Sequence, residues 1–366
     1  MNNSNFLHRL KRLRDITSLE FRGMVLVVAV ILIFISFKIT LSRFNSTDVI
    51  PRVKPINTAV IKQFGEFAVK AKVGMFFKNI PVFDVRNDTF QIDAIVWFVF
   101  NPDEITLEII EKFSFDKGKI LQKSPPDLRV LGDKVFVKYN VLFAFNGNLN
   151  YHKFPFEDHQ VAFILSNDFV TPNEMYFMAD SSSFCAAPEI FPANWKLQDL
   201  NIEPGFIDLE LDQQDKTNIS QSPKVLYTIR VAKASIKGML VLFIPLFAAV
   251  FFSLFTFLMN LTNSKGKFTL ALSALTALLS YRFVIERVIP DVAYFTKIDE
   301  IYLLFLIITF LCLLFQLIFT REYAIYIEQH KNLPLSAFTI WRKINAITFI
   351  IVCILFITST MYLILT

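Results

Sequence analysis

Five long apolar stretches are the feature that most constrains how this chain can fold. They cover residues 24–41, 239–259, 268–285, 301–320 and 344–365. A helix needs ~20 apolar residues to cross a hydrocarbon core of ~30 Å, and each stretch is close to that length. The sequence therefore predicts five transmembrane helices, one near the start of the chain and four in its last third.

Composition points to the same class of protein. Hydrophobic residues make up 54% of the 366 residues, which include 42 phenylalanines and nine glycines. Such a chain is too apolar to be soluble. Residues 43–235 differ from the rest, because apolar and polar positions alternate there and Pro and Asn are frequent. That block is large enough for one folded β domain.

The charges that flank the first stretch predict its orientation. Arg9, Lys11, Arg12, Arg14 and Arg22 precede it, so residues 1–23 are expected in the cytoplasm. A cleaved signal peptide is the alternative, but residues 38–43 show no small-x-small cleavage pattern. We therefore expect residues 24–42 to be an uncleaved signal anchor in the plasma (inner) membrane, with the large domain outside the cytoplasm.

Alternating hydrophobicity within the outer block predicts strands. These are residues 73–83, 89–100, 134–145, 160–167, 196–203 and 224–232. Residues 84–88 form the turn of a hairpin, residues 105–113 allow one short helix, and the acidic stretch 208–222 is expected to be an exposed hairpin tip or loop. The predicted fold is an extracytoplasmic antiparallel β-sandwich at 43–235, followed by a four-helix transmembrane bundle at 236–366.

The helix predicted at 267–289 carries its hydroxyl groups on one side. At about 100° per residue, the four Ser and Thr residues fall within an arc of roughly 60°. This stripe consists of Thr269, Ser273, Thr276 and Ser280, extended by Phe283 and Arg287. Such a pattern is typical of a helix that lines a water-filled pore. The alternative is that the hydroxyls pack against other helices or bond their own backbone carbonyls.

Several motifs resemble a known family. They are Val73-Gly74-Met75-Phe76, the segment 89–93, Tyr151 followed by Phe154-Pro155-Phe156-Glu157-Asp158-His159-Gln160, Pro245 in a membrane helix, and the segment 289–299. Together they resemble the pentameric ligand-gated ion channels, the superfamily of the Cys-loop receptors, over residues 56–366. The missing cysteine pair and the short link between the last two helices are similar to the bacterial type.

The resemblance implies a homopentamer in which an agonist, a small molecule or a proton, binds the β-sandwich and opens a central pore for inorganic ions. Counted through the family pattern, the pore-facing positions are the same six stripe residues. Two departures stand out: Thr276 stands where the family usually has a leucine-type ring, and the N-terminal membrane helix is additional.

The resemblance also implies a gating interface at the membrane boundary. Its expected members are Asp84, Asp88, Phe154, Pro155, Phe156, Glu157, Asp158, Arg230, Lys233, Pro290, Tyr294 and Asp299. One carboxylate, from Glu157 or Asp158, is expected to pair with one cation, from Arg230 or Lys233. Charged groups at such a half-buried junction can exchange partners between two discrete states.

Ion selectivity leans weakly toward anions. Lys265 and Lys267 stand at the expected cytoplasmic mouth of the pore, where a cation channel of the family would carry a ring of Glu. The same lysines also serve as ordinary topology anchors.

Other classes of function find little support in the sequence. Cys185, Cys312 and Cys353 are scattered, and the spacing of His152 and His159 belongs to the loop already assigned, so we expect neither a metal site nor a cofactor. Motifs of enzymes are missing, and the net charge of +5 reads as a topology signal that implies no nucleic acid. Membrane lipid and ions are the expected partners. The remaining alternative is a non-conducting sensor or accessory subunit, and the agonist-binding residues are unknown.

Overall fold

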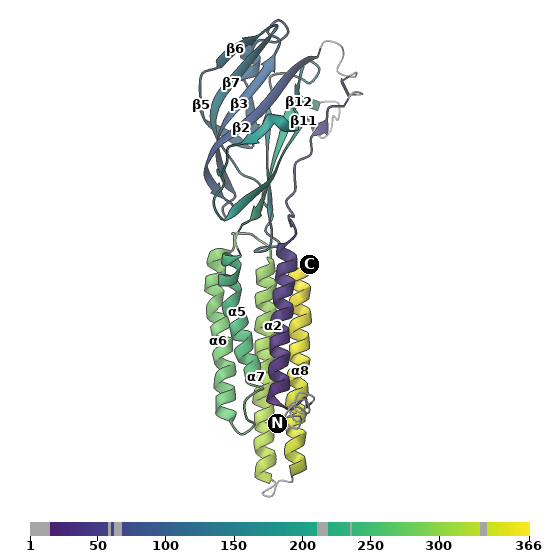
Figure 1. Ribbon diagram of the computed structural model, residues 1–366, viewed down its shortest axis with the longest axis vertical. Helices are drawn as coiled ribbons and strands as arrows, with labels where there is room; N and C mark the ends of the chain where they lie inside the picture. The colour runs from purple at the N-terminus through teal and green to yellow at the C-terminus, as the bar shows by residue number, and fades with distance from the viewer. Residues whose placement is uncertain (1–14, 58–59, 62–67, 211–218, 235, 330–334) are drawn as a thin grey trace, which may run out of the picture. The chain divides into compact units, whose positions relative to one another are not determined.

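The computed structural model of the chain describes residues 15–57, 60–61, 68–210, 219–234, 236–329 and 335–366 (Figure 1). The chain divides into two compact units. The helical unit comprises Met1–Phe44, His152–Phe156 and Ile236–Thr366, and the β-rich unit comprises Asn45–Tyr151 and Glu157–Ser235. The short segment His152–Phe156 thus belongs to the helical unit although strands precede and follow it in the sequence.

Five long helices build the helical unit. They are α2 (Leu19–Leu41), α5 (Lys237–Phe255), α6 (Ser264–Val288), α7 (Lys297–Gln329) and α8 (Leu335–Leu365). Each has a stretch long and apolar enough to cross a membrane. Four of the five predicted apolar stretches are helical throughout, whereas α5 ends at Phe255, four residues before the end of the stretch 239–259. The chain is compatible with a membrane protein that carries a β-rich domain.

Helix α2 begins five residues earlier than the apolar stretch that predicted it. Ser18 is the N-cap, and its hydroxyl accepts a hydrogen bond from the Phe21 amide. Glu20 lies in the first turn and Lys38 in the last, as the helix dipole favours. The polar first turn is helical because it is capped, which a hydropathy window does not detect.

The helices pack around one apolar core. Helix α5 contacts α6 and α7, α7 contacts α8, and α2 lies along α8, as the purple and yellow ribbons of Figure 1 show. The core contains Leu246, Phe305 and Phe356, all fully buried, and includes Leu26 and Ile33 of α2. The N-terminal helix is therefore packed into the same core as the other four.

Polar contacts hold the start of α2 in place. The Arg22 guanidinium, 9% exposed, donates to the Phe257 carbonyl at 2.6 Å and to the Thr17 carbonyl at 3.2 Å. The Asn345 amide of α8 donates to the same Phe257 carbonyl at 2.8 Å. This carbonyl follows the end of α5, where helix geometry leaves backbone acceptors without intrahelical partners. Three helices are thus joined at one backbone oxygen.

The β-rich unit contains two sheets. In the first, the order is β1 (Lys54–Pro55), β11 (Trp195–Glu210), β12 (Ile219–Lys233), β8 (His159–Ser166) and β4 (Ser114–Asp116). In the second, the order is β10 (Phe184–Ala186), β2 (Val69–Asp84), β3 (Thr89–Phe100), β7 (Lys134–Phe145) and β5 (Gly118–Lys123), while β6 (Asp127–Leu131) pairs with β7 and β9 (Met175–Met178) with β2. Helix α4 (Leu107–Glu111) is short.

All six predicted strands are present, but the pairing is not purely antiparallel. Strands β9 and β10 run parallel to β2. Strand β3 pairs with one edge of β2, and the two short strands pair with the opposite edge. They thereby satisfy backbone groups of β2 that would otherwise be exposed. Strands of three and four residues are too short to leave an alternating pattern, which is why the sequence did not predict them.

Aromatic rings from the two sheets pack against one another. Phe115 of β4 stacks on Phe143 of β7 with ring centroids 4.0 Å apart, and Phe163 of β8 lies 5.2 Å from Phe143. Phe184 of β10 contacts Tyr227 of β12 edge-on at 4.9 Å. These rings fill the space between the two layers.

Within the acidic stretch 208–222, strand pairing extends further than predicted. The ladder between β11 and β12 continues to Glu210 and Ile219, with Asp208 opposite Gln221. Cross-strand hydrogen bonds therefore override the polar composition of these residues. Asp212 and Asp215 lie outside the described residues.

Candidate pore and coupling site

All six predicted pore residues lie on one exposed face of α6. In the single chain, all six side chains are exposed: Thr269, Ser273, Thr276, Ser280, Phe283 and Arg287. The opposite face carries Ala271, Ala274, Leu278 and Ile285, which are buried against the neighbouring helices. The hydroxyl stripe therefore does not pack against other helices of this chain, which was one of the two alternatives to a pore lining.

The other alternative, bonding to the helix backbone, applies to one residue. The Thr276 hydroxyl donates to the Leu272 carbonyl at 2.9 Å. Among the described residues, the hydroxyls of Thr269, Ser273 and Ser280 have no hydrogen-bond partner. A hydroxyl left without a partner in hydrocarbon is costly, so these three positions are better suited to water.

The two lysines expected at the pore mouth differ in placement. Lys265 is exposed, whereas Lys267 is 1% exposed and its ammonium lies 5.5 Å from the centre of the Phe319 ring. Lys267 thus points into the helical unit and does not lie on the stripe face. Its contact with Phe319 is a cation–π interaction between α6 and α7.

The segment His152–Phe156 packs on the link between α6 and α7. The His152 ring stacks on the Tyr294 ring, with centroids 3.8 Å apart and planes 3° from parallel. The amides of Lys297 and Ile298 donate to the carbonyls of His152 and Phe154 at 2.9 and 3.1 Å. Ring stacking and backbone hydrogen bonds therefore tie this segment to the first turn of α7.

Phe156 anchors the same segment in the apolar core of the helical unit. It is buried, stacks on Phe243 of α5 at 5.4 Å, and lies 5.5 Å from Phe37 of α2. The peptide bond between Phe154 and Pro155 is cis. Pro290 is also buried. Of the predicted gating residues, Phe154, Pro155, Phe156, Pro290, Tyr294 and Asp299 thus belong to the helical unit.

Asp299 has two roles at the start of α7. Its carboxylate accepts hydrogen bonds from the Thr296 amide at 3.0 Å and the Thr296 hydroxyl at 2.7 Å, and it pairs with Arg282 of α6 at 2.5 Å. Arg282 also lies 5.5 Å from the Tyr302 ring. Sequence reasoning passed over Arg282, although a charge inside an apolar span is the signal that identifies such a residue.

The remaining coupling residues lie in the β-rich unit. The Lys233 ammonium is 3.6 Å from a Glu157 oxygen, and Asp158 accepts hydrogen bonds from the backbone amides of Lys233 and Asn45 at 3.0 and 2.9 Å. Strands β12 and β8 are antiparallel, so the end of one lies beside the start of the other. Arg230 instead pairs with Asp199, at 3.5 Å.

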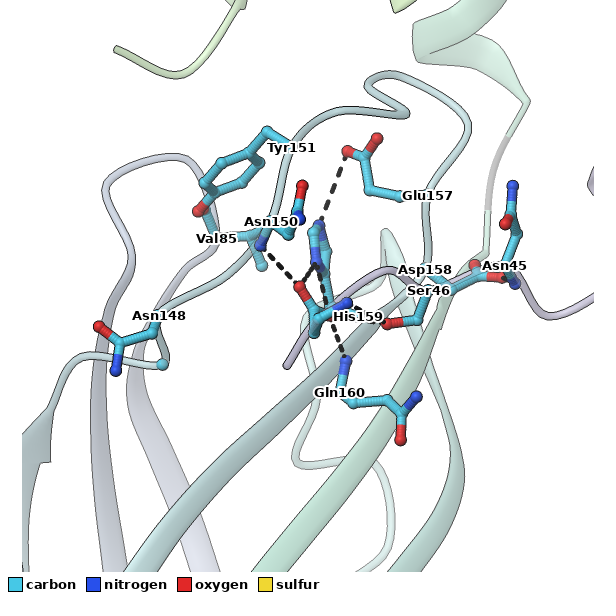
Figure 2. Close-up of polar contacts among 12 residues, drawn as sticks. Asn45, Ser46, Val85, Asn148, Asn150, Tyr151, Glu157, Asp158, His159 and Gln160 are labelled. Atoms are coloured by element: carbon cyan, nitrogen blue, oxygen red, sulfur yellow. Dashed lines mark hydrogen bonds and ion pairs between the residues drawn. The ribbon is translucent and has the colours of Figure 1, made fainter. Parts of the chain in front are cut away.

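His159 is the centre of this cluster, although the sequence pattern placed it only in a loop. It is completely buried between two carboxylates: Nδ1 lies 3.2 Å from Asp48 and Nε2 lies 3.7 Å from Glu157. Figure 2 shows the His159 ring facing Glu157. Asp48 also accepts hydrogen bonds from the amides of Asn150 and Gln160, both at 2.7 Å. The segment that follows α2 is thereby fixed to the start of β8.

Ionisation of the cluster follows from these contacts. Burial alone would lower the His159 pKa, but the hydrogen bond with Asp48 and the negative charges of Asp48 and Glu157 raise it overall. Burial would raise the Asp48 pKa, but the hydrogen bond and charge of His159 lower it overall. Burial lowers the pKa of Lys233, although Glu157 and Asp158 oppose that effect. An imidazolium between two carboxylates is the state that this geometry favours.

The two aspartates of the predicted hairpin turn act within the β-rich unit. Asp84 accepts hydrogen bonds from the Asn87 amide and side chain, which lower its pKa. Asp88 accepts from the amides of Gly147 and Asn148 at 3.0 and 2.9 Å, yet burial raises its pKa. Asp88 thereby links the β2–β3 turn to the segment that leads into the Tyr151 loop.

A polar groove of about 500 Å³ opens beside the β11–β12 hairpin. Its charged lining residues include Lys224, which is buried and whose ammonium lies 2.6 Å from Asp116 and 3.8 Å from Asp168. Ser222, also buried, lines the same groove. Carboxylates, an ammonium and a hydroxyl in one hollow are groups that can orient a small polar ligand.

Compared with known proteins, the sequence matches no protein-family model and no curated protein.

Proposed function

We propose that this chain is one subunit of a homopentameric ligand-gated ion channel of the plasma membrane, with α6 lining a central pore. The observation that carries the proposal is the face of α6. Its six predicted pore residues are exposed together, while the apolar face of the same helix packs inside the chain. Five such faces around an axis would form rings of hydroxyls in contact with water.

The pore would be gated near Phe283, which is 69% exposed on the stripe. A ring of five phenylalanines is a hydrophobic constriction that closes by dewetting.

Lys265 and Arg287 are exposed at the two ends of α6 and support the weak preference for anions. Measuring the reversal potential in asymmetric chloride tests that preference, and a cation-selective current would contradict it.

Coupling would run along the chain through Phe156 and Glu157. These neighbours in sequence belong to different clusters: Phe156 is stacked on Phe243, and Glu157 is held by His159 and Lys233. A movement of β12 in an extracytoplasmic β-sandwich would therefore displace the segment His152–Phe156, which packs against Tyr294.

The polar groove at Lys224 is the candidate agonist site, suited to a small polar molecule.

Cysteine accessibility tests the pore. Cys185 is exposed and is first replaced by Ser, while Cys312 and Cys353 are buried. Single cysteines at Ser273 and Ser280 should then react with a hydrophilic, membrane-impermeant thiol reagent and block the current. Leu272 and Leu279 are matched controls, because both are exposed in the chain but lie off the stripe.

The outcome separates the two candidate functions. If the stripe cysteines react no more than the control cysteines at positions 272 and 279, α6 does not line a pore. A non-conducting sensor with the same fold is then favoured, and the observation that supports it is the additional helix α2, anchored through Arg22.

A further inference from the structure

A groove between α2 and α5 belongs to neither the pore nor the coupling cluster. Its volume is about 640 Å³. Almost all of its lining side chains are apolar, and five of them are phenylalanines, among them Phe34 and Phe37 of α2 and Phe243 and Phe247 of α5. Helix α2 is additional to the four-helix bundle, so this groove exists because that helix is present.

The polar groups of the groove are confined to one end. Lys38, in the last turn of α2, and Ser42, just after it, line the end where the chain leaves the helix. The Lys38 side chain is exposed, and its ammonium has no ion pair or hydrogen bond among the described residues. The groove therefore combines an apolar body with one cation at its end.

The length of the groove matches one leaflet. Its lining residues run from Val30 of α2 to Ser42, just after the helix, which corresponds to about 18 Å at the rise of a helix. Half of the hydrocarbon core measures ~15 Å. A single acyl chain of one leaflet thus spans the groove, and a lysine near the end of a membrane helix extends its ammonium to the headgroup region.

We propose that the groove binds a phospholipid with an anionic headgroup, its acyl chain between α2 and α5 and its phosphate on Lys38. Both helices are long and apolar enough to lie in the bilayer, which supplies this ligand at high concentration. The unpaired cation complements the charge of the phosphate. Since Phe37 also contacts Phe156, the bound chain would stiffen the packing around the segment His152–Phe156.

Photocrosslinking of the full chain tests the proposal. The purified protein in detergent receives phosphatidylglycerol with a photoreactive acyl chain, and adducts are mapped by mass spectrometry. We expect adducts on Phe34, Phe37 and the facing residues of α5. Replacing Ala248, a half-buried lining residue, by Trp should abolish them, because the indole fills the groove.

Matched variants distinguish the contribution of the Lys38 charge from that of the apolar groove. Lys38→Gln should weaken phosphatidylglycerol binding by about five-fold, the contribution of one lysine near anionic headgroups. Arg43→Gln, a nearby exposed cation outside the lining, should leave binding unchanged. Ile318→Trp adds an indole at an exposed position of α7 outside the groove and controls for Ala248→Trp. If Ala248→Trp misfolds, Ile244→Trp fills the groove from its exposed rim.

Several outcomes overturn the proposal. Adducts spread evenly over all five helices would show unspecific solvation by lipid, and equal binding of a neutral diacylglycerol would remove the role of Lys38. Crosslinks from the groove to a second copy would mean that protein fills it. An intact mass that lacks residues of α2 would remove the groove altogether. None of these outcomes depends on whether the chain conducts ions.

Discussion

At the scale of single residues, buried charge is the dominant feature of the β-rich unit. His159 is fully buried, and its two neighbours Asp48 and Glu157 are almost fully buried as well. Removing one partner of such a group leaves an uncompensated charge away from water. The identity of His159 therefore determines both the stability of the unit and its response to pH.

The response to pH has a definite sign. The pKa of His159 is raised in the fold, so its contribution to stability is complete below the unfolded value of about 6.5 and is lost as the pH rises through the folded pKa. The pKa of Asp48 is lowered, so its contribution is complete above about 3.9 and is lost as the pH falls through the folded pKa. The unit is therefore most stable between these limits.

We predict that His159→Gln removes the loss of stability above pH 6.5. At pH 6 the variant should be less stable than the wild type by about 3 kcal/mol, since Asp48 and Glu157 remain buried without a cation between them. Thermal unfolding measured from pH 5 to pH 9 checks both effects. His152→Gln, a histidine outside this cluster, should keep the wild-type profile, and a parallel profile for His159→Gln would contradict the assignment.

At the scale of elements, polar contacts hold α2 in the helical unit. Its apolar side chains supply packing but little orientation, since lipid is as apolar as a neighbouring helix. Polar contacts supply the orientation: Arg22 and Asn345 both donate to the Phe257 carbonyl, and Arg342 of α8 donates to the Thr17 carbonyl at 3.2 Å. The N-terminal helix is thereby fixed in rotation and depth.

We predict that Arg22 and Asn345 are energetically coupled. Arg22→Met and Asn345→Leu each remove one donor from the Phe257 carbonyl, and each should cost about 1–2 kcal/mol. The double variant should cost more than the sum, because the buried carbonyl then has neither donor. Unfolding measured over the four proteins gives the coupling energy, and strictly additive effects would show that the two contacts are independent.

At the scale of the whole molecule, the main feature is the exposed stripe of α6, whose six side chains are not covered by the rest of the described chain. Three hydroxyls without partners among the described residues are unfavourable in lipid but suit a water-filled axis surrounded by other copies. Head-to-tail contacts between copies form a closed ring when the rotation from one copy to the next closes.

We predict that detergent-corrected light scattering gives a particle of five chains, each of 42.3 kDa. Replacement of Phe283 by Ala should widen the constriction and raise the current while leaving the particle mass unchanged. A monomer or dimer in mild detergent, silent under every agonist and pH, would instead favour the sensor.

Much of the fold followed from periodicity alone. The five helices and six long strands each repeat a hydrophobic pattern over enough residues for sequence to detect them, and the stripe of α6 was visible because all its members share one helix. The short strands β9 and β10 were missed because their partner β2 is distant in the sequence. The capped first turn of α2 and the paired ends of β11 and β12 were missed because hydrogen bonds stabilise them and an apolar repeat does not.

Sequence by itself determined which segments are apolar enough for a membrane and which face of α6 carries the hydroxyls, since both depend only on neighbours along the chain. The tertiary structure alone decided that Lys233 and not Arg230 meets Glu157, that Lys267 turns toward Phe319, and that Asp48 and His159 form the buried centre of the cluster. Asp48 and His159 are separated by 111 positions, and only strand pairing and packing bring such residues within reach of one another.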